Sequence, residues 1–216
     1  MSILVVNPNS SVTVTDAIAE ALRPLGPHFE VVQIDEGPDT IRTDADVTQA
    51  GQRFAALAES RPDADGFITA CFSDPGLDLA RTRVSQPVTG AQEAALLAAA
   101  ALGRFGIIAL SERAIPRHLA RVAAMGLADR LVAELPLSDV SAMDSGRDPA
   151  AYAQILAHGR TLRDGGARSI VLGCAGMAAL TVRLEADLSV PVVEPILAAG
   201  RLALARLHSE PSEDRP

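Results

Sequence analysis

Short apolar runs alternate with amphipathic stretches along most of the chain. Runs rich in Val, Ile and Leu are typical of buried parallel strands, and apolar positions spaced by three and four are typical of helices. Strands are predicted at residues 3–6, 29–34, 66–70, 87–89, 105–109, 130–135, 169–172 and 191–193. Helices are predicted at residues 12–23, 45–59, 92–102 and 149–163, after residues 111 and 176, and at the end to about 207. This alternation favours an α/β fold of parallel sheets with helices on both faces.

The second half of the chain repeats the plan of the first. Several features of the first half have a counterpart about 100 residues later. The strand at 3–6 corresponds to the one at 105–109, Cys71 to Cys174, and Pro87-Val88 to Pro191-Val192. Because element order and cysteine position agree together, an internal duplication is favoured over the accidental similarity that the halves of any α/β chain can show. We therefore expect two pseudo-symmetric, doubly wound lobes with a cleft between them. The expected lobes are residues 1–97 plus 200–216, and residues 98–199.

Both cysteines directly follow a predicted strand. Ligands of parallel α/β sheets bind outside the carboxyl ends of the strands. Asn7 and Ser111 also fall at such ends. If the halves pack about a pseudo-dyad, all four residues face one cleft, and the thiols of Cys71 and Cys174 approach it from opposite sides.

Two facing thiols suit the racemisation of a carbon acid. A planar carbanion has two faces, so one group can remove a proton from one face while the other group returns a proton to the opposite face. The reference pKa of a thiol, about 8.5, is within reach of neutral pH, and a helix N-terminus can lower it. Each cysteine precedes a predicted helix start, whose N–H groups could stabilise a thiolate or an oxyanion. The alternative is that each cysteine is a small buried apolar residue.

Composition excludes other chemistry. The chain has 216 residues and a net charge of −8, and all 19 of its basic residues are Arg. Without Lys there is no Schiff base and no P-loop lysine. The acidic charge and the 3% aromatic content argue against a nucleic-acid partner. The apolar run at 94–103 is too short for a membrane span of roughly 20 residues, and the N-terminus lacks a signal-peptide pattern, so we expect a cytoplasmic protein without a membrane partner.

The remaining polar residues have simpler assignments. No metal site is expected, because no histidine has the spacing of a metal ligand. Each histidine is assigned to the surface or to a helix cap, namely His28, His118, His158 and His208. Asp74, followed by Pro75, is expected to cap a helix, and Glu93 to favour the dipole of the helix at 92–102. Contacts of these two carboxylates with a ligand are the less favoured alternative.

Several segments resemble those of hydantoin racemases, a family within the aspartate/glutamate racemase superfamily. They are ILVVNPNSS at 3–11, TACFSDPGL at 69–77, PVTGAQEAA at 87–95 and VLGCAGMA at 171–178. The resemblance covers most of the chain in order. It implies a racemase that needs no cofactor, with the site between two α/β lobes and Cys71 and Cys174 as the acid/base pair. The implied substrates are 5-substituted hydantoins and allantoin, and the low aromatic content near the motifs favours a small or polar one.

The resemblance also implies substrate contacts. They are Asn7, Phe72, Ser73, Ser111, and the backbone of Ala175 and Gly176. For Phe72 a position in the core is an equal alternative.

The chain departs from the family pattern in the expected pocket walls. Leu110-Ser111 stands where a Thr pair is common, and Ser73 stands where Gly is expected. Glu194-Pro195 replaces a frequent Asp-Gly, and the loop at 35–48 lacks the usual family sequence. These departures bear on the substrate more than on the reaction.

Other functions stay open. The same fold could racemise aspartate or glutamate, or use one thiol in a maleate isomerase or an arylmalonate decarboxylase. A two-lobed protein that only binds a small molecule would hold two inert thiols. A small-molecule ligand is expected in every case, and a homo-oligomer stays open.

Overall fold

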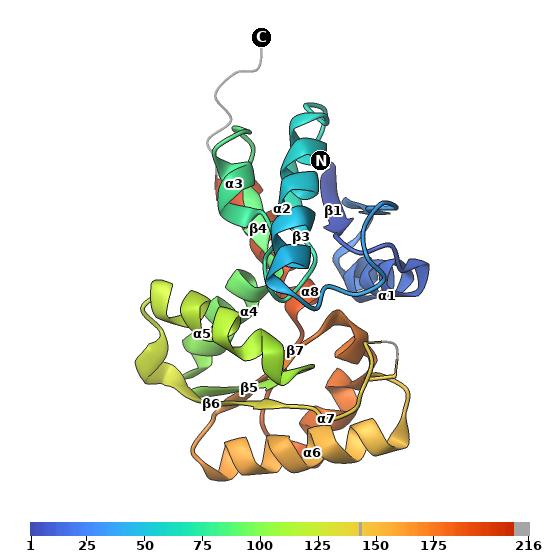
Figure 1. The fold of residues 1–216 in the computed structure, drawn as a ribbon. Helices are drawn as coiled ribbons and strands as arrows, with labels where there is room; N and C mark the ends of the chain where they lie inside the picture. The colour runs from blue at the N-terminus through green and yellow to red at the C-terminus, as the bar shows by residue number, and fades with distance from the viewer. Residues whose placement is uncertain (143, 210–216) are drawn as a thin grey trace.

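The computed structural model describes residues 1–142 and 144–209, which form two parallel sheets flanked by helices (Figure 1). The strands are β1 (Ile3–Asn7), β2 (Phe29–Gln33), β3 (Gly66–Thr69), β4 (Val88–Gly90), β5 (Phe105–Ala109), β6 (Leu131–Pro136), β7 (Ser169–Gly173) and β8 (Val192–Val193). Their order is β2-β1-β3-β4 in the first sheet and β6-β5-β7-β8 in the second. The same order in both halves confirms the predicted α/β fold of two pseudo-symmetric, doubly wound lobes. The expected end of the first lobe, residues 210–216, lies outside the described residues.

Eight α-helices are described. They are α1 (Val12–Leu22), α2 (Asp44–Glu59), α3 (Leu77–Arg81), α4 (Ala91–Leu102), α5 (Ile115–Ala124), α6 (Pro149–Asp164), α7 (Thr181–Leu188) and α8 (Pro195–Ser209). Short 3-10 helices are η1 (Arg23–Leu25), η2 (Glu112–Ala114), η3 (Ala128–Arg130) and η4 (Ala175–Leu180). No helix in this described part of the chain is long and apolar enough to cross a membrane.

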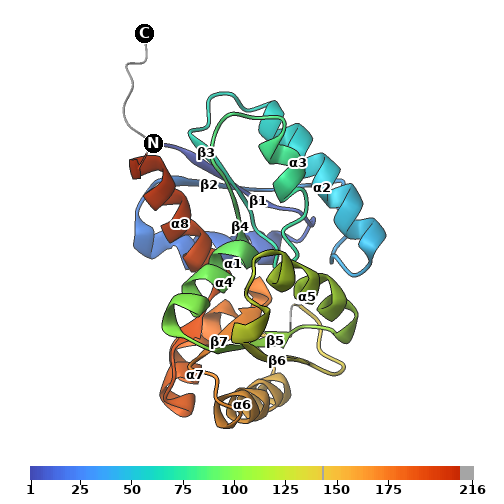
Figure 2. The same cartoon turned by 90° about the vertical axis from the view of Figure 1, so that its left-hand side faces the viewer.

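The central strands are covered on both faces. Every residue of β1, β3, β5 and β7 is buried, which explains why these strands read as unbroken apolar runs in the sequence. Figure 2 shows α2 and α3 on one face of the first sheet and α1 and α8 on the other. In the second lobe, α6 and α7 cover one face, while α4 and α5 cover the face toward the first lobe.

Two helices are exchanged between the lobes. α4 follows the last strand of the first sheet, but its Leu96 lies in the core of the second lobe with Phe105. α8 follows the last strand of the second sheet, and its Ala199 lies in the core of the first lobe with Ile3. The polypeptide therefore passes between the lobes within these two helices. The expected boundaries, at 97–98 and 199–200, fall inside them.

Charged groups around Glu93, at the start of α4, also join the lobes. Arg81 of α3 and Arg206 of α8 approach its carboxylate to 2.7 and 3.1 Å, and Arg121 of α5 approaches it to 3.7 Å. Burial would raise the pKa of Glu93, but Arg81 and Arg206 outweigh burial and lower the pKa. Glu93 lies at the start of a helix, as expected, and its carboxylate also links α4 to α3, α5 and α8.

Candidate active site

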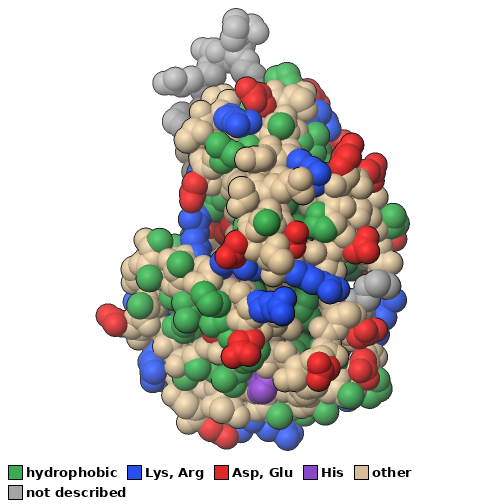
Figure 3. All heavy atoms as spheres, viewed as in Figure 1, with side chains coloured by type: hydrophobic (Ala, Val, Ile, Leu, Met, Phe, Trp, Pro, Cys, Tyr) green, Lys and Arg blue, Asp and Glu red, His purple; other side chains and the backbone are tan. Residues whose placement is uncertain are grey.

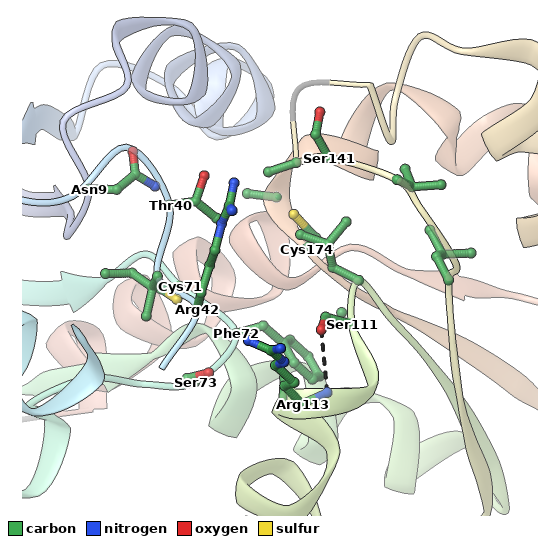
Figure 4. A pocket seen from close by; sticks show the side chains of 18 of the residues that line it. Asn9, Thr40, Arg42, Cys71, Phe72, Ser73, Ser111, Arg113, Ser141 and Cys174 are labelled. Atoms are coloured by element: carbon green, nitrogen blue, oxygen red, sulfur yellow. Dashed lines mark hydrogen bonds between the residues drawn. The ribbon is translucent and has the colours of Figure 1, made fainter. Parts of the chain in front are cut away.

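A cavity of about 540 Å³ lies between the lobes, at the carboxyl ends of the strands (Figure 4). This volume is typical of a small-molecule site. Cys71, which follows β3, and Cys174, which follows β7, both line it. They lie on opposite sides of the cavity in Figure 4. The placement follows from the topology, because β3 and β7 hold equivalent positions in the two sheets.

The two cysteines lie in equivalent turns. In each turn, the backbone N–H of the residue two positions after the cysteine donates a hydrogen bond to the sulfur. Ser73 donates to Cys71, and Gly176 donates to Cys174. The helix predicted to begin at Pro75, after Cys71, begins at Leu77. Cys174 precedes the 3-10 helix η4. One N–H of each turn, joined at Cys174 by the hydroxyl of Ser145, therefore favours a thiolate here, rather than the dipole of an α-helix.

Both thiols are held in the protonated form at neutral pH. Burial raises the pKa of Cys71 to about 11, although the N–H of Ser73 opposes the shift. Negative charge on Cys174 or Asp74 would raise this pKa further, and Arg117 lowers it. Burial also raises the pKa of Cys174, against the N–H of Gly176. Because negative charge on Cys174 raises the pKa of Cys71, one thiolate and one thiol are favoured over two thiolates.

Asn7 lies behind the cavity wall and orients its neighbour. Its side chain is fully buried, and its Nδ2 donates to Asn9 Oδ1 at 3.0 Å and to Thr15 Oγ1 at 3.0 Å. The N–H of Ser11 also donates to Asn9 Oδ1, at 2.9 Å. With its oxygen occupied in this way, Asn9 has its amide NH₂ group left for the cavity, which it lines. Asn9, two residues beyond the predicted contact, is the asparagine that a ligand would meet.

Of the other residues predicted to contact the substrate, four line the cavity and one packs behind its wall. Phe72, Ser73, Ser111 and Ala175 line the cavity. Gly176 lies outside the lining and packs tightly, since a Cβ there would collide with the carbonyl oxygen of Ala142.

Asp74 caps a distant helix. Its φ of 44° turns the carboxylate toward the start of α4, where the N–H groups of Gln92 and Glu93 donate to it at 2.7 and 2.8 Å. The expected cap of a helix at Pro75 is therefore wrong. Gly90 leaves room for this contact, because a Cβ there would collide with the carboxylate. Burial raises the pKa of Asp74 to about 7, although the two N–H donors oppose the shift.

Glu194 caps the other exchanged helix. Glu194 stands between β8 and α8, a position equivalent to that of Gly90 between β4 and α4. Its carboxyl group accepts hydrogen bonds from the N–H groups of Ile196 and Leu197 at 2.9 and 2.6 Å. Burial raises its pKa to about 7, against these two donors. The unexpected Glu194-Pro195 sequence thus supplies a helix cap, and neither Glu194 nor Asp74 lines the cavity.

His118 belongs to a buried polar chain, so its assignment to the surface or a cap is wrong. Its Nδ1 lies 2.5 Å from Glu134 Oε1, and both side chains are at most 3% exposed. Because a carboxylate only accepts hydrogen bonds, Nδ1 carries the hydrogen and donates it. Nε2 lies 3.4 Å from Ser73 Oγ, and the ring meets Phe72 edge-on at 4.9 Å. The chain Glu134–His118–Ser73 therefore ends at the cavity wall.

Three arginines also line the cavity. They are Arg42, Arg113 and Arg117. No sequence pattern indicates their position in the cavity, because arginines on helices and in loops usually face solvent. No local spacing signals the pair of His118 and Glu134 either, since the contact depends on the packing of α5 against β6. Among the described residues, no group of three or more His, Cys, Asp or Glu side chains could hold a metal ion.

Comparison with known proteins gives a consistent result. The family described as Asp/Glu/Hydantoin racemase matches residues 3–203. The chain is 32% identical to a hydantoin racemase from Paenarthrobacter aurescens, over 94% of this chain and 89% of the relative. It is 33% identical to a hydantoin racemase from Rhizobium meliloti, over 96% and 89% of the two chains. An allantoin racemase structure from Klebsiella pneumoniae superposes with a TM-score of 0.87 at 29% identity, over 96% and 88%.

The buried pair of His118 and Glu134 predicts a stability effect. His118→Phe leaves a buried carboxylate without its partner, and we expect a loss of about 3–5 kcal/mol in the free energy of unfolding, measured in urea. Adding Glu134→Leu removes the isolated charge, so the double variant should recover most of this loss. His28→Phe, at a half-buried histidine, serves as the control and should change little. A double variant as unstable as His118→Phe would contradict the interpretation.

The two capping carboxylates predict how stability depends on pH. Folded Asp74 and Glu194 hold their protons to about pH 7, whereas in the unfolded chain they lose them near pH 4. The folded state therefore binds more protons in this window, and the free energy of unfolding should fall as the pH rises from 5 to 7. In the double variant Asp74→Asn/Glu194→Gln, this slope should be smaller. An unchanged slope would contradict the assignment, whatever the absolute stability of the variant.

Proposed function

Since the chain belongs to the Asp/Glu/hydantoin racemase family and is a racemase, we propose that it inverts C5 of a 5-substituted hydantoin or of allantoin, with Cys71 and Cys174 as the acid/base pair. The observation that carries the proposal is the position of two thiols on opposite sides of one cavity. Reactions that need a single thiol, such as decarboxylation followed by protonation, do not account for the second one. The similarity to hydantoin and allantoin racemases favours the same substrate class.

The chemistry follows from the two faces of the planar intermediate. A thiolate removes the C5 proton from one face, and the electron pair is delocalised onto the adjacent ring carbonyl as an enolate. The thiol on the opposite wall then gives its proton to the other face of C5. After the reaction, the base has become a thiol and the acid a thiolate, so the enzyme is ready for the reverse direction. The ring carbonyl stores the charge, which is why this scheme needs no cofactor.

Hydrogen-bond donors around the cavity can stabilise the enolate. The NH₂ group of Asn9 faces the cavity, because its oxygen is held by Asn7 and Ser11. The hydroxyl of Ser111 is a further donor in the lining, whereas that of Ser73 donates to His118 Nε2. Donors fixed in advance are effective because they need little reorganisation as the charge develops. The substrate is thus held by groups whose orientation does not depend on its presence.

Substitution of each cysteine tests the two-base scheme. We expect Cys71→Ala and Cys174→Ala each to lower the rate of racemisation of both enantiomers by about a hundred- to ten-thousandfold, measured by polarimetry. In D₂O, each variant should still exchange the C5 proton of one enantiomer, namely the one whose proton faces the remaining thiol. The two variants should exchange opposite enantiomers.

This reciprocal pattern has a built-in control, since each variant serves as the reference for the other. Circular dichroism of the protein should show that both variants are folded. Racemisation at the wild-type rate in either variant, or exchange of the same enantiomer in both, would contradict the two-base scheme.

The raised pKa of the thiols predicts the pH profile. At pH 7 the free enzyme holds little thiolate, and the thiolate fraction grows as the pH approaches the pKa of the thiols. We therefore expect kcat/KM to rise between pH 7 and pH 9, by up to about tenfold per pH unit. The titration of the hydantoin ring is measured separately and subtracted. A flat or falling profile over this range would contradict a thiolate base.

A further inference from the structure

The charge of the cavity differs in sign from that of the protein. The chain carries a net charge of −8, yet its cavity is lined by three arginines and one carboxylate. These charged residues are Arg42, Arg113, Arg117 and Asp139. Figure 3 shows basic side chains gathered along the boundary between the lobes, while acidic ones are spread over the rest of this face. Positive charge is therefore concentrated where a ligand would enter.

Two of the three arginines are free to bind an anion. Arg117 Nη1 forms an ion pair with Asp44 Oδ1 at 2.7 Å, so much of its charge is compensated. Within residues 1–142 and 144–209, Arg42 and Arg113 form no ion pair and their guanidinium groups donate no hydrogen bond to the protein. The charge of Asp46 attracts that of Arg42, but the Asp46 carboxylate accepts its hydrogen bonds from the backbone N–H groups of Arg42 and Thr43, not from the guanidinium. A guanidinium that lines a cavity without a hydrogen-bonded carboxylate is well placed to receive one from a ligand.

The two arginines come from different lobes. Arg42 lies on the loop between β2 and α2, and Arg113 lies in η2, after β5. In Figure 4 the guanidinium of Arg42 lies over the space between Cys71 and Cys174, and Arg113 lies near Ser111 and Phe72. A ligand with C5 between the thiols would have one guanidinium from each lobe beside it.

We propose that the 5-substituent of the substrate carries a carboxylate, which Arg42 and Arg113 bind. This inference rests on the proposed function for the position of C5. A guanidinium presents paired N–H donors that match the two oxygens of a carboxylate, which a neutral substituent lacks. The hydantoin ring is held by the neutral donors Asn9 and Ser111, so the positive charge of the cavity is left for a second, anionic part of the substrate.

The test compares an acid with its neutral isostere. Racemic 5-(carboxymethyl)hydantoin and racemic 5-(carbamoylmethyl)hydantoin differ by one charge at nearly equal size. Their binding to the wild-type enzyme is measured by titration calorimetry, which does not depend on turnover, and racemisation of the pure enantiomers is followed by polarimetry. We expect the acid to bind about tenfold or more tightly than the amide, as for hydrogen bonds to charged groups.

Variants separate the two arginines from the overall charge of the protein. Arg42→Gln and Arg113→Gln should each reduce the preference for the acid about three- to tenfold, with little change for the amide. Arg201→Gln serves as a charge-matched control, because Arg201 is exposed on α8 and lies outside the cavity lining. It should leave the preference unchanged.

The outcomes separate this inference from the proposed function. Equal binding of acid and amide by the wild-type enzyme would overturn the inference, even if both compounds are racemised. A loss of equal size for acid and amide in the Arg variants would also overturn it, because the arginines would then act on the ring or the enolate. Tight, arginine-dependent binding of the acid without racemisation of any hydantoin would support the anionic ligand and overturn the proposed reaction.

Discussion

Two buried carboxylates fix the starts of the helices that the lobes exchange, and the arrangement of the site depends on them. Asp74 binds the first N–H groups of α4, and Glu194 binds those of α8. Each cap offsets the burial of a carboxyl group with two hydrogen bonds from a helix N-terminus. Asp74 is three residues beyond Cys71, so its cap also fixes the turn that presents the first thiol. Stability and the position of a reactive group are therefore linked through one side chain.

The fold could be predicted from the sequence because the strands at the centre of each sheet are buried on both faces. The strand at 105–109 was predicted with its observed ends, and that at 130–135 was displaced by one residue. The positions of Cys71 and Cys174 at the cavity follow from topology alone, since parallel strands present their carboxyl ends at one edge. Residues one or two positions beyond the end of a strand could thus be placed at the cavity from the sequence.

Side chains that act across the fold could not be predicted in this way. Asp74 was expected to cap the segment that follows it, but α4 provides the N–H groups. His118 was assigned to the surface or to a cap because nothing near it in sequence indicates Glu134 as its partner. Arg42 and Arg113 reach the cavity from different lobes, and their local sequences resemble those of solvent-exposed arginines. In each case the partner or the surroundings are distant in the chain.

The exchange of α4 and α8 has a consequence for how such a protein can arise. A chain with only one of these halves would leave one face of its sheet partly uncovered, because the helix that follows its last strand packs on the other half. It could bury that face only by accepting the same helix from an identical chain. A half-length ancestor would thus have been an obligate homodimer, with its ligand on the two-fold axis between two identical thiols. Fusion of the two copies would free each to change separately, and the two helices are now capped differently, α4 by Asp74 of the preceding loop and α8 by the adjacent Glu194.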